Sequence, residues 1–196
     1  MKAHELKRAK REVRRSVLTL RDAMSPEERG RLGALAVRRF LSLVEVDRAG
    51  TVSAFWSFGS EVPTDPLLSG LLERGIRVAL PRVVGDTLEL RSWAAGDPVT
   101  TTTFGAREPA GGERVDPSEV DVVCTPAVAF DRRGHRVGYG GGFYDRLFSS
   151  TRADALRAGI AFDVQVVEGD LPQGRFDQPV DVVVTPTRML RREGER

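Results

Sequence analysis

Cysteine and histidine are scarce in this sequence of 196 residues. It contains one cysteine, Cys124, and two histidines, His4 and His135. A single thiol cannot form an intramolecular disulfide, and this favours a reducing compartment such as the cytoplasm. So few nitrogen and sulfur ligands also argue against a zinc centre. Cys124 stands in an apolar strand pattern, which predicts a buried, unreactive thiol.

Long apolar runs are missing as well. No uninterrupted hydrophobic stretch approaches the roughly 20 residues that a membrane-spanning helix needs. The first thirty residues are basic and polar, unlike a secretory signal. With 40% hydrophobic and 30% charged residues, the composition is that of a soluble globular protein. No Pro/Ser-rich linker divides the chain, so residues 1–196 are expected to form one cytoplasmic domain with no membrane partner.

Lysine is confined to the first ten residues, and positive charge gathers at the N-terminus. Residues 1–39 hold 12 Lys/Arg and 5 Asp/Glu, a net charge of +7, whereas residues 40–196 hold 18 and 23, a net charge of −5. Such a basic helix is usually a solvated surface, and nucleic-acid binding is the main alternative. Against that alternative, no aromatic residue for base stacking occurs in the first 39 positions. A spacing of three and four predicts one apolar face for a helix over 5–22, formed by Leu6, Ala9, Val13, Val17 and Leu20.

Alternating helix and strand patterns follow. Ser25, Pro26 and Glu28 form a capping box that starts a second helix, which is expected to run to about Val44. Thr64 is expected to cap a third helix that stops at Gly75. Residues 94–119 show little periodicity and are interpreted as a long surface excursion. Strands are predicted at 51–56, 76–80, 87–93 (antiparallel or at an edge), 121–126 and 181–186.

The strand, helix and strand between residues 51 and 80 form a crossover unit. Such units pair their strands in parallel and leave room for a ligand at the carboxyl ends of the strands. The predicted fold is therefore an α/β domain of three layers, with an open, mostly parallel sheet and helices on both faces. Trp56 and Glu61 fall at the ligand end, although taken alone they are typical of a core aromatic and a solvated loop charge.

The glycine-rich stretch 134–146 is the strongest local signal. Five of its thirteen residues are glycine, and an amphipathic run follows. Glycine lets a backbone approach a ligand closely, and the unpaired amides of the helix after it favour an anion, most often a phosphate. The stretch lacks the Lys-Ser/Thr pair of a Walker loop, and Phe143 stands where a dinucleotide fingerprint needs glycine. It is a phosphate-loop candidate of neither standard type.

With its flanks, this stretch resembles the signature of the 5-formyltetrahydrofolate cyclo-ligases, also called methenyltetrahydrofolate synthetases. Residues 134–145 match Gly-x-Arg-hydrophobic-Gly-x-Gly-x-Gly-Tyr-Tyr-Asp, with Phe143 at the first tyrosine. Residues 171–181 resemble the second signature, Leu/Val-Pro-x-x-x-x-Asp-x-x-hydrophobic-Asp. The family's Lys-x-x-hydrophobic-Arg element corresponds to residues 10–14, about fifteen residues before Ser25. The resemblance spans residues 10 to about 185.

The resemblance implies conversion of 5-formyltetrahydrofolate to 5,10-methenyltetrahydrofolate, with ATP cleaved to ADP and phosphate and with Mg²⁺ present. Transfer of the γ-phosphoryl group to the formyl oxygen activates the formyl carbon, which N10 of the folate then attacks. No enzyme nucleophile is needed, which agrees with the lack of a convincing Ser-His-Asp or Cys-His arrangement. The protein then supplies positioning and charge neutralisation.

The resemblance also implies residue roles. The family's catalytic positions correspond to Lys10, Arg136 and Tyr144. Its metal ligands correspond to Asp145 and Asp177, although Asp145 alone is equally typical of a residue that interacts with a helix dipole. The predicted substrate-binding residues are Trp56, Glu61, Tyr139 and Tyr144. The predicted ATP-binding residues are Lys10, Arg14, Arg136, Gly138, Tyr139, Gly140, Gly141, Gly142, Phe143 and Tyr144.

Some positions depart from the family pattern. Phe143 replaces a tyrosine, and Phe176 stands where many members have histidine. These departures leave open a family paralogue that uses the ATP site on another substrate. A basic-helix nucleic-acid or interaction module is the alternative from another class. The expected partners are 5-formyltetrahydrofolate and ATP, without nucleic acid, and the expected state is a monomer or weak homodimer. The charged tail 191–196 is expected to be disordered.

Overall fold

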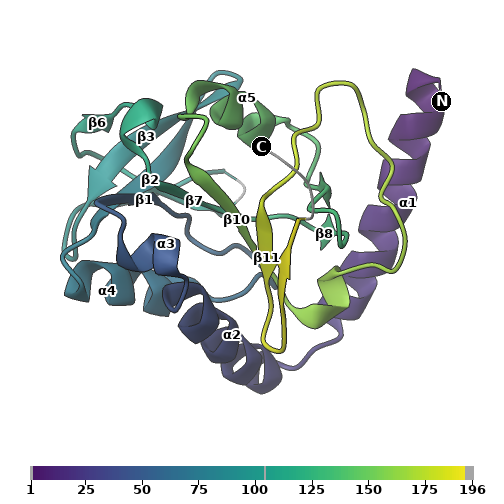
Figure 1. Ribbon diagram of the computed structural model, residues 1–196, viewed down its shortest axis with the longest axis horizontal. Helices are drawn as coiled ribbons and strands as arrows, with labels where there is room; N and C mark the ends of the chain where they lie inside the picture. Colours follow the sequence, from purple (N-terminus) through teal and green to yellow (C-terminus); the bar gives the residue numbers. More distant parts are fainter. Residues whose placement is uncertain (1, 104, 193–196) are drawn as a thin grey trace.

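An open sheet of eight strands is the centre of the computed structural model, which describes residues 2–103 and 105–192 (Figure 1). The strand order is β12-β11-β10-β7-β1-β2-β3-β6. The inner strands β11, β10, β7, β1 and β2 are parallel, whereas β12, β3 and β6 pair antiparallel with their neighbours. The α/β fold with a mostly parallel open sheet is thus confirmed. The sheet strands are β1 (Thr51–Ser53), β2 (Arg77–Val84), β3 (Thr87–Trp93), β6 (Arg114–Val115), β7 (Val122–Thr125), β10 (Leu156–Ile160), β11 (Val182–Val184) and β12 (Met189–Arg191).

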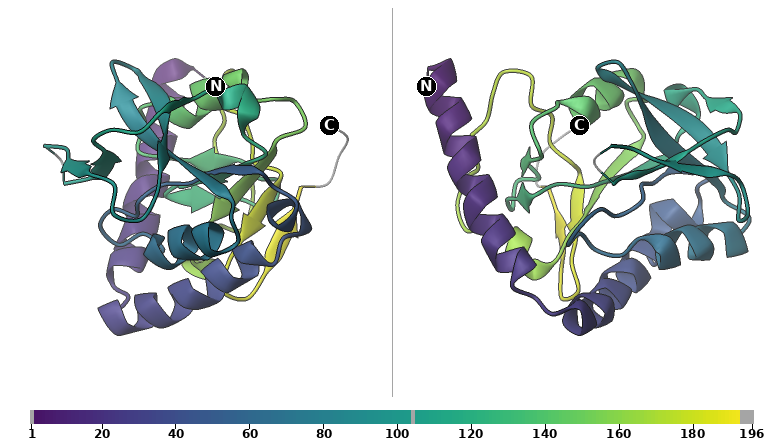
Figure 2. Two further views of the ribbon diagram at one scale, coloured as in Figure 1. Left: turned by 90° about the vertical axis from the view of Figure 1, so that its left-hand side faces the viewer. Right: turned by 180° about the vertical axis from the view of Figure 1, so that it is seen from behind.

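Helices cover both faces of this sheet, as predicted. α2, α3 and α4 pack on one face, and α5 packs on the other beside the short helix η1, whereas the short helix η2 lies against α1 (Figures 1 and 2). Burial of each large apolar side chain at these faces contributes about 1.5–3 kcal/mol. α1 lies to one side, against the small hairpin of β8 and β9. The bounds are α1 (Ala3–Asp22), α2 (Pro26–Leu41), α3 (Val44–Asp47), α4 (Asp65–Glu73), η1 (Pro117–Glu119), β8 (Ala129–Phe130), β9 (Arg136–Val137), α5 (Phe143–Ser150) and η2 (Asp163–Gln165).

Two predicted helix boundaries need correction. Ser25 does accept a hydrogen bond from the amide of Glu28, 3.1 Å, and starts α2. However, α2 ends at Leu41 rather than near Val44, because the Ser42 hydroxyl donates to a backbone carbonyl of the last turn, and α3 is a separate turn. Thr64 stands at the start of α4, but its hydroxyl accepts from the amide of Ser57, 2.8 Å, instead of capping the helix.

The segment 94–119 has more regular structure than its composition predicts. It contains the hairpin of β4 (Val99–Thr101) and β5 (Arg107–Pro109), and β6 joins the main sheet beside β3. β3 is therefore antiparallel, as predicted, but it is not an edge strand. Sequence periodicity could not reveal β6, because two residues are too short to show an alternation. β10 is a parallel strand that the sequence did not predict, because Arg157 and Gly159 interrupt its apolar pattern.

The crossover unit is as predicted: β1 and β2 are parallel and are joined by α4. Cys124 is fully buried in β7, and burial raises the pKa of its thiol. At the C-terminus, Arg191 ends β12 and pairs with Glu45, 2.9 Å, so the predicted disorder is wrong for this residue. Residues 193–196 of the predicted tail lie outside the described residues. In the described part of the chain, no helix has both the length and the apolar character to cross a membrane.

Candidate active site

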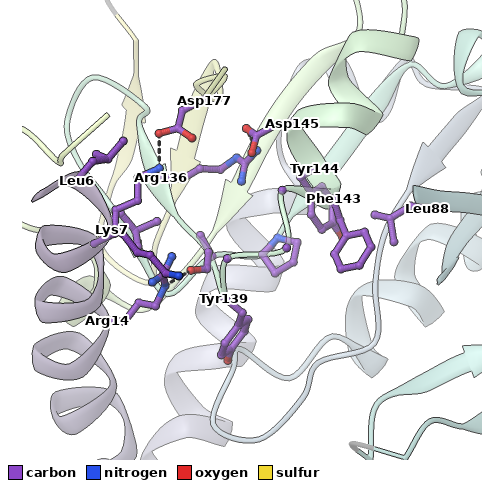
Figure 3. Close-up of a pocket in the computed structure, with 18 of the residues that line it drawn as sticks. Leu6, Lys7, Arg14, Leu88, Arg136, Tyr139, Phe143, Tyr144, Asp145 and Asp177 are labelled. Carbon is purple, nitrogen blue, oxygen red and sulfur yellow. Dashed lines mark hydrogen bonds and ion pairs between the residues drawn. The ribbon is translucent and has the colours of Figure 1, made fainter. Parts of the chain in front are cut away.

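A cavity of about 640 Å³ lies between α1, the glycine-rich loop and the start of α5 (Figure 3). This volume is typical of a small-molecule site. All the predicted site residues except Trp56 line it. They come from distant parts of the sequence, which meet where the loops leave the sheet. The predicted residues at the wall are Lys10, Arg14, Glu61, Arg136, Gly138, Tyr139, Gly140, Gly141, Gly142, Phe143, Tyr144, Asp145 and Asp177.

Backbone conformation explains three glycines of the loop. Gly134 has φ +79°, and a Cβ placed on it would lie 2.1 Å from the carbonyl oxygen of Val180. Gly140 and Gly142 have φ +108° and +66°, in the region that favours glycine. Gly142 is the N-cap of α5 and offers no side chain to the first amides of the helix. The loop therefore brings free backbone N–H groups to the cavity, an arrangement suited to an anion.

Cations from α1 and β9 surround this loop. Arg14 donates from Nε to the carbonyl oxygen of Gly138, 2.6 Å, which fixes the loop against α1. Lys10 forms an ion pair with Asp177. Arg136 is almost buried, with 7% of its side chain exposed, and its Nη2 lies 2.6 Å from Oδ1 of Asp145. Burial lowers the pKa of Arg136, and the charge of Asp145 opposes that effect.

Asp145 and Asp177 each have one carboxylate oxygen that accepts hydrogen bonds from protein groups. Oδ1 of Asp145 also accepts from the amide of Gln178, 3.0 Å, and Oδ2 of Asp177 accepts from the amide of Gly174, 2.7 Å. Among the residues that the structure describes, no group of three His, Cys, Asp or Glu residues could hold a metal ion by itself. Two separate carboxylates nevertheless fit Mg²⁺, which takes most of its ligands from water and phosphate oxygens.

The opposite side of the cavity carries a buried carboxyl group. Glu61 is 9% exposed, and its Oε2 accepts from the amide of Phe58, 2.9 Å. Burial raises the pKa of Glu61, and the Phe58 amide, the charge of Arg21 and the hydroxyl of Tyr139 lower it in part. Burial likewise raises the pKa of Tyr144, so its phenol remains a hydrogen-bond donor at neutral pH. This side of the site offers both an acceptor and a donor.

Trp56 lies away from this cavity. It is 7% exposed, and its ring meets the ring of Trp93 edge to face, with centroids 5.2 Å apart. The guanidinium of Arg107 lies 5.3 Å from the Trp56 centroid. The structure therefore gives Trp56 the core environment that its residue type alone predicted. Its role as a substrate wall stays a prediction.

Three supporting residues were not predicted from the sequence. Arg21 donates to the hydroxyl of Tyr139, 2.9 Å, and Gln178 binds Asp145 through its backbone amide. Asp131 is 1% exposed and accepts hydrogen bonds from the amides of His135 and Leu171, which joins the two signature segments. The position of Asp131 before a glycine turn was the only available signal for it.

Residues 6–186 match the model of the 5-formyltetrahydrofolate cyclo-ligase family. The chain belongs to this family. The 5-formyltetrahydrofolate cyclo-ligase of Escherichia coli (strain K12) is 36% identical over 176 residues, which cover 86% of this chain and 96% of that protein. The 5-formyltetrahydrofolate cyclo-ligase of Mycolicibacterium smegmatis is 34% identical over 190 residues, or 92% and 95% of the two chains.

Solved structures show the same fold. The NMR structure of the Aquifex aeolicus 5,10-methenyltetrahydrofolate synthetase has a TM-score of 0.84 and 36% identity, and the match covers 95% of this chain and 94% of that one. A 5,10-methenyltetrahydrofolate synthetase from Mycoplasma pneumoniae has a TM-score of 0.74 at 22% identity. The cyclo-ligase signature recognised in residues 134–145 thus belongs to a chain that is similar to the family over nearly its whole length.

Proposed function

We infer that this chain is a 5-formyltetrahydrofolate cyclo-ligase, which converts 5-formyltetrahydrofolate to 5,10-methenyltetrahydrofolate. ATP is the phosphoryl donor in this proposal. The observation that carries it is a single cavity with a glycine loop and four cations on one side, Lys7, Lys10, Arg14 and Arg136, and a buried carboxyl group on the other. The first side suits a triphosphate, and the second suits the hydrogen-bonding edge of a pterin.

The proposed chemistry needs no nucleophile from the protein. The formyl oxygen attacks the γ-phosphorus of ATP, and ADP leaves. N10 of the folate then attacks the activated formyl carbon, the C–O bond breaks, and phosphate departs with the former formyl oxygen while N10 loses its proton. The enzyme contributes orientation of the two substrates, charge neutralisation and exclusion of water.

The positions of the side chains support specific roles. The amides of the glycine loop and the cations Lys10, Arg14 and Arg136 would hold the phosphates. Lys10 and Arg136 now neutralise Asp177 and Asp145, so both cations are already fixed at the cavity wall. Tyr144, at the start of α5, lies between the two sides of the cavity: the guanidinium of Arg136 is 5.9 Å from its ring centroid, and the charge of Glu61 also acts on its phenol.

Mg²⁺ would be held by Asp145 and Asp177, directly or through water. Bound there, it would neutralise phosphate charge. Each carboxylate has one oxygen that accepts no hydrogen bond from the described residues, and these two oxygens suit a metal that keeps its other positions for water and phosphate. The ion pairs with Arg136 and Lys10 fix the orientation of the two carboxylates.

At the folate end, Glu61 would accept hydrogen bonds from the N–H groups of the pterin, and Tyr139 and Tyr144 would line the same end. Phe143 and Phe176 remain the departures that could alter substrate choice. For α1, the cations of one face point into this cavity, so a solvated or nucleic-acid-binding helix explains less of the structure than a substrate role (Figure 3). Cytoplasmic location and a monomeric or weakly dimeric state stay predictions.

An absorbance assay tests the proposed function. Purified protein is mixed with 5-formyltetrahydrofolate, and the near-ultraviolet band of the methenyl product is followed. The band is expected to grow only when both ATP and Mg²⁺ are present. A folded protein that binds ATP but forms no methenyl product would contradict the assigned substrate and favour the paralogue alternative. Growth of the band without ATP would contradict the phosphoryl-transfer chemistry.

A further inference from the structure

Arg21 occupies an unusual position at the end of α1. Its side chain is only 2% exposed, although sequence periodicity places its neighbour Leu20 on the packed face, and Leu20 is 54% exposed instead. Nε of Arg21 donates to the hydroxyl of Ser60, 2.9 Å, and Nη2 donates to the hydroxyl of Tyr139, 2.9 Å. One planar guanidinium thus joins three segments: the end of α1, the loop before α4, and the glycine loop.

A purely structural role explains this side chain poorly. A buried arginine is normally paired with a carboxylate, because removal of a charge from water is costly. Within residues 2–103 and 105–192, both hydrogen-bond partners of Arg21 are neutral hydroxyls, and Nη1 is buried with no partner. The nearby carboxylate of Asp22 accepts from the Ser60 hydroxyl rather than from Arg21. Glu61 is the carboxyl group on which the Arg21 charge acts, since that charge partly offsets the effect of burial on the pKa of Glu61. Arg21 is therefore linked to the Glu61 turn both electrostatically and through the Ser60 hydroxyl.

The two hydroxyls that Arg21 holds border the folate side of the cavity. Ser60 immediately precedes Glu61, and Tyr139 lines the cavity beside Glu61, with which its hydroxyl interacts. Arg14, seven residues earlier on α1, binds Gly138, the residue before Tyr139. Because residues seven apart lie on the same helical face, Arg14 and Arg21 bind two consecutive residues of the glycine loop from the same side of α1. Of these two contacts, the one through Arg21 also reaches the Glu61 turn, where Asp22 of α1 accepts from the same Ser60 hydroxyl.

We propose that Arg21 is a positioning residue, which fixes Tyr139 and the Ser60–Glu61 turn relative to each other and thereby sets how the pterin end of 5-formyltetrahydrofolate is held. The inference rests on the proposed function and extends it to a residue outside the cavity wall. Arg21 acts through its two partners and does not touch the reacting atoms. Its loss affects the folate subsite more than the phosphate subsite, which Lys10, Arg14 and Arg136 form.

Steady-state kinetics of four variants test this. Arg21→Ala removes the guanidinium, and Arg21→Lys keeps the charge but cannot reproduce the planar fork. Tyr139→Phe removes one acceptor, and the double variant Arg21→Ala/Tyr139→Phe closes a double-mutant cycle. Arg39→Ala is the matched control, because Arg39 is a partly buried arginine of α2 that donates to the carbonyl oxygen of Pro186, 3.1 Å, and has no contact with the cavity.

Arg21→Ala is expected to raise the KM for 5-formyltetrahydrofolate on the order of tenfold, as for loss of one hydrogen bond to a charged group, while the KM for ATP changes about twofold or less. Arg21→Lys is expected to fold and to raise the folate KM several-fold. In the Arg21→Ala background, Tyr139→Phe is expected to raise the folate KM little further. Arg39→Ala lowers the melting temperature without changing either KM.

Three outcomes would overturn the inference. The first is a folate KM in Arg21→Lys equal to that of the wild type. This variant also tests the inference if Arg21→Ala fails to fold. The second is an equal increase in both KM values, and the third is full additivity with Tyr139→Phe. If the wild-type protein forms no methenyl product, the proposed function fails and the inference fails with it. An active wild type with unaffected Arg21 variants removes the inference alone.

Discussion

Replacement of Asp145 by asparagine separates the proposed metal role from a role in helix stability. Oδ1 of Asp145 lies 2.6 Å from Nη2 of Arg136 and 3.0 Å from the amide of Gln178, and asparagine can keep one acceptor in the same place. Hydrogen bonds to charged groups contribute about 1.5–3 kcal/mol and neutral ones about 0.5–1.5 kcal/mol. The substitution is thus expected to cost about 1–2 kcal/mol, which lowers Tm by about 3–6 °C.

The effect of Asp145→Asn on catalysis is expected to be much larger. A preorganised charged group at a phosphoryl-transfer site is worth on the order of 100-fold in kcat. The assay is kcat at saturating substrates across a Mg²⁺ titration, below the Tm of the variant, where the Mg²⁺ requirement should also rise. Asp170→Asn is the control, because Asp170 forms a surface ion pair with Arg133 and 64% of its side chain is exposed. Wild-type kcat and Mg²⁺ dependence in Asp145→Asn would refute the assignment and leave Asp145 as a residue of the helix start.

Other substitutions test other parts of the site. Lys10→Ala should raise the KM for ATP about tenfold, as for loss of one charge-assisted phosphate contact, with little change in the folate KM. An unchanged ATP KM would contradict the phosphate role of Lys10. Gly134→Ala should lower Tm by at least about 5 °C, because φ is +79° and the new Cβ would meet the carbonyl oxygen of Val180. Gly85→Ala is the control and should lower Tm less, because Gly85 has φ +62° but open space around it. Equal losses of Tm would show that the close approach to Val180 does not matter. Burial raises the pKa of Glu61, so kcat/KM for the folate should fall on acidification at a pH above the ordinary glutamate pKa of about 4.3. Glu61→Gln should lack this acidic fall in the pH profile. An identical fall in Glu61→Gln would assign it to another titrating group.

Much of the fold could be predicted from local patterns. The crossover of β1, α4 and β2 follows from an apolar strand, a helix that begins after Thr64, and a stop at Gly75. The strands β6 and β10 could not be predicted, because one has two residues and the other carries Arg157 and Gly159. A ring of Phe130 lies against Gly159, where a Cβ would be 2.6 Å from it, and no local sequence signal reveals that tertiary contact.

The site was predictable where it depends on motif residues and unpredictable where it depends on their supports. The glycine loop was recognised by its composition and spacing, and the cations by their resemblance to the family's motifs, and these residues do meet in one cavity. Arg21 was hidden because a charged residue in a helical pattern is normally assigned to solvent. Trp56 illustrates the opposite case. Its position at the end of a strand predicted that it faces the ligand, yet its ring is buried beside Trp93.

The fate of the formyl oxygen tests the central claim most directly. The protein is incubated with ATP, Mg²⁺ and 5-formyltetrahydrofolate labelled with ¹⁸O in the formyl group, and the released phosphate is analysed by mass spectrometry. Phosphoryl transfer to the formyl oxygen predicts that each phosphate carries one labelled oxygen, because that oxygen leaves with the phosphorus. Methenyl product accompanied by unlabelled phosphate, with the label in water, would contradict the proposed chemistry.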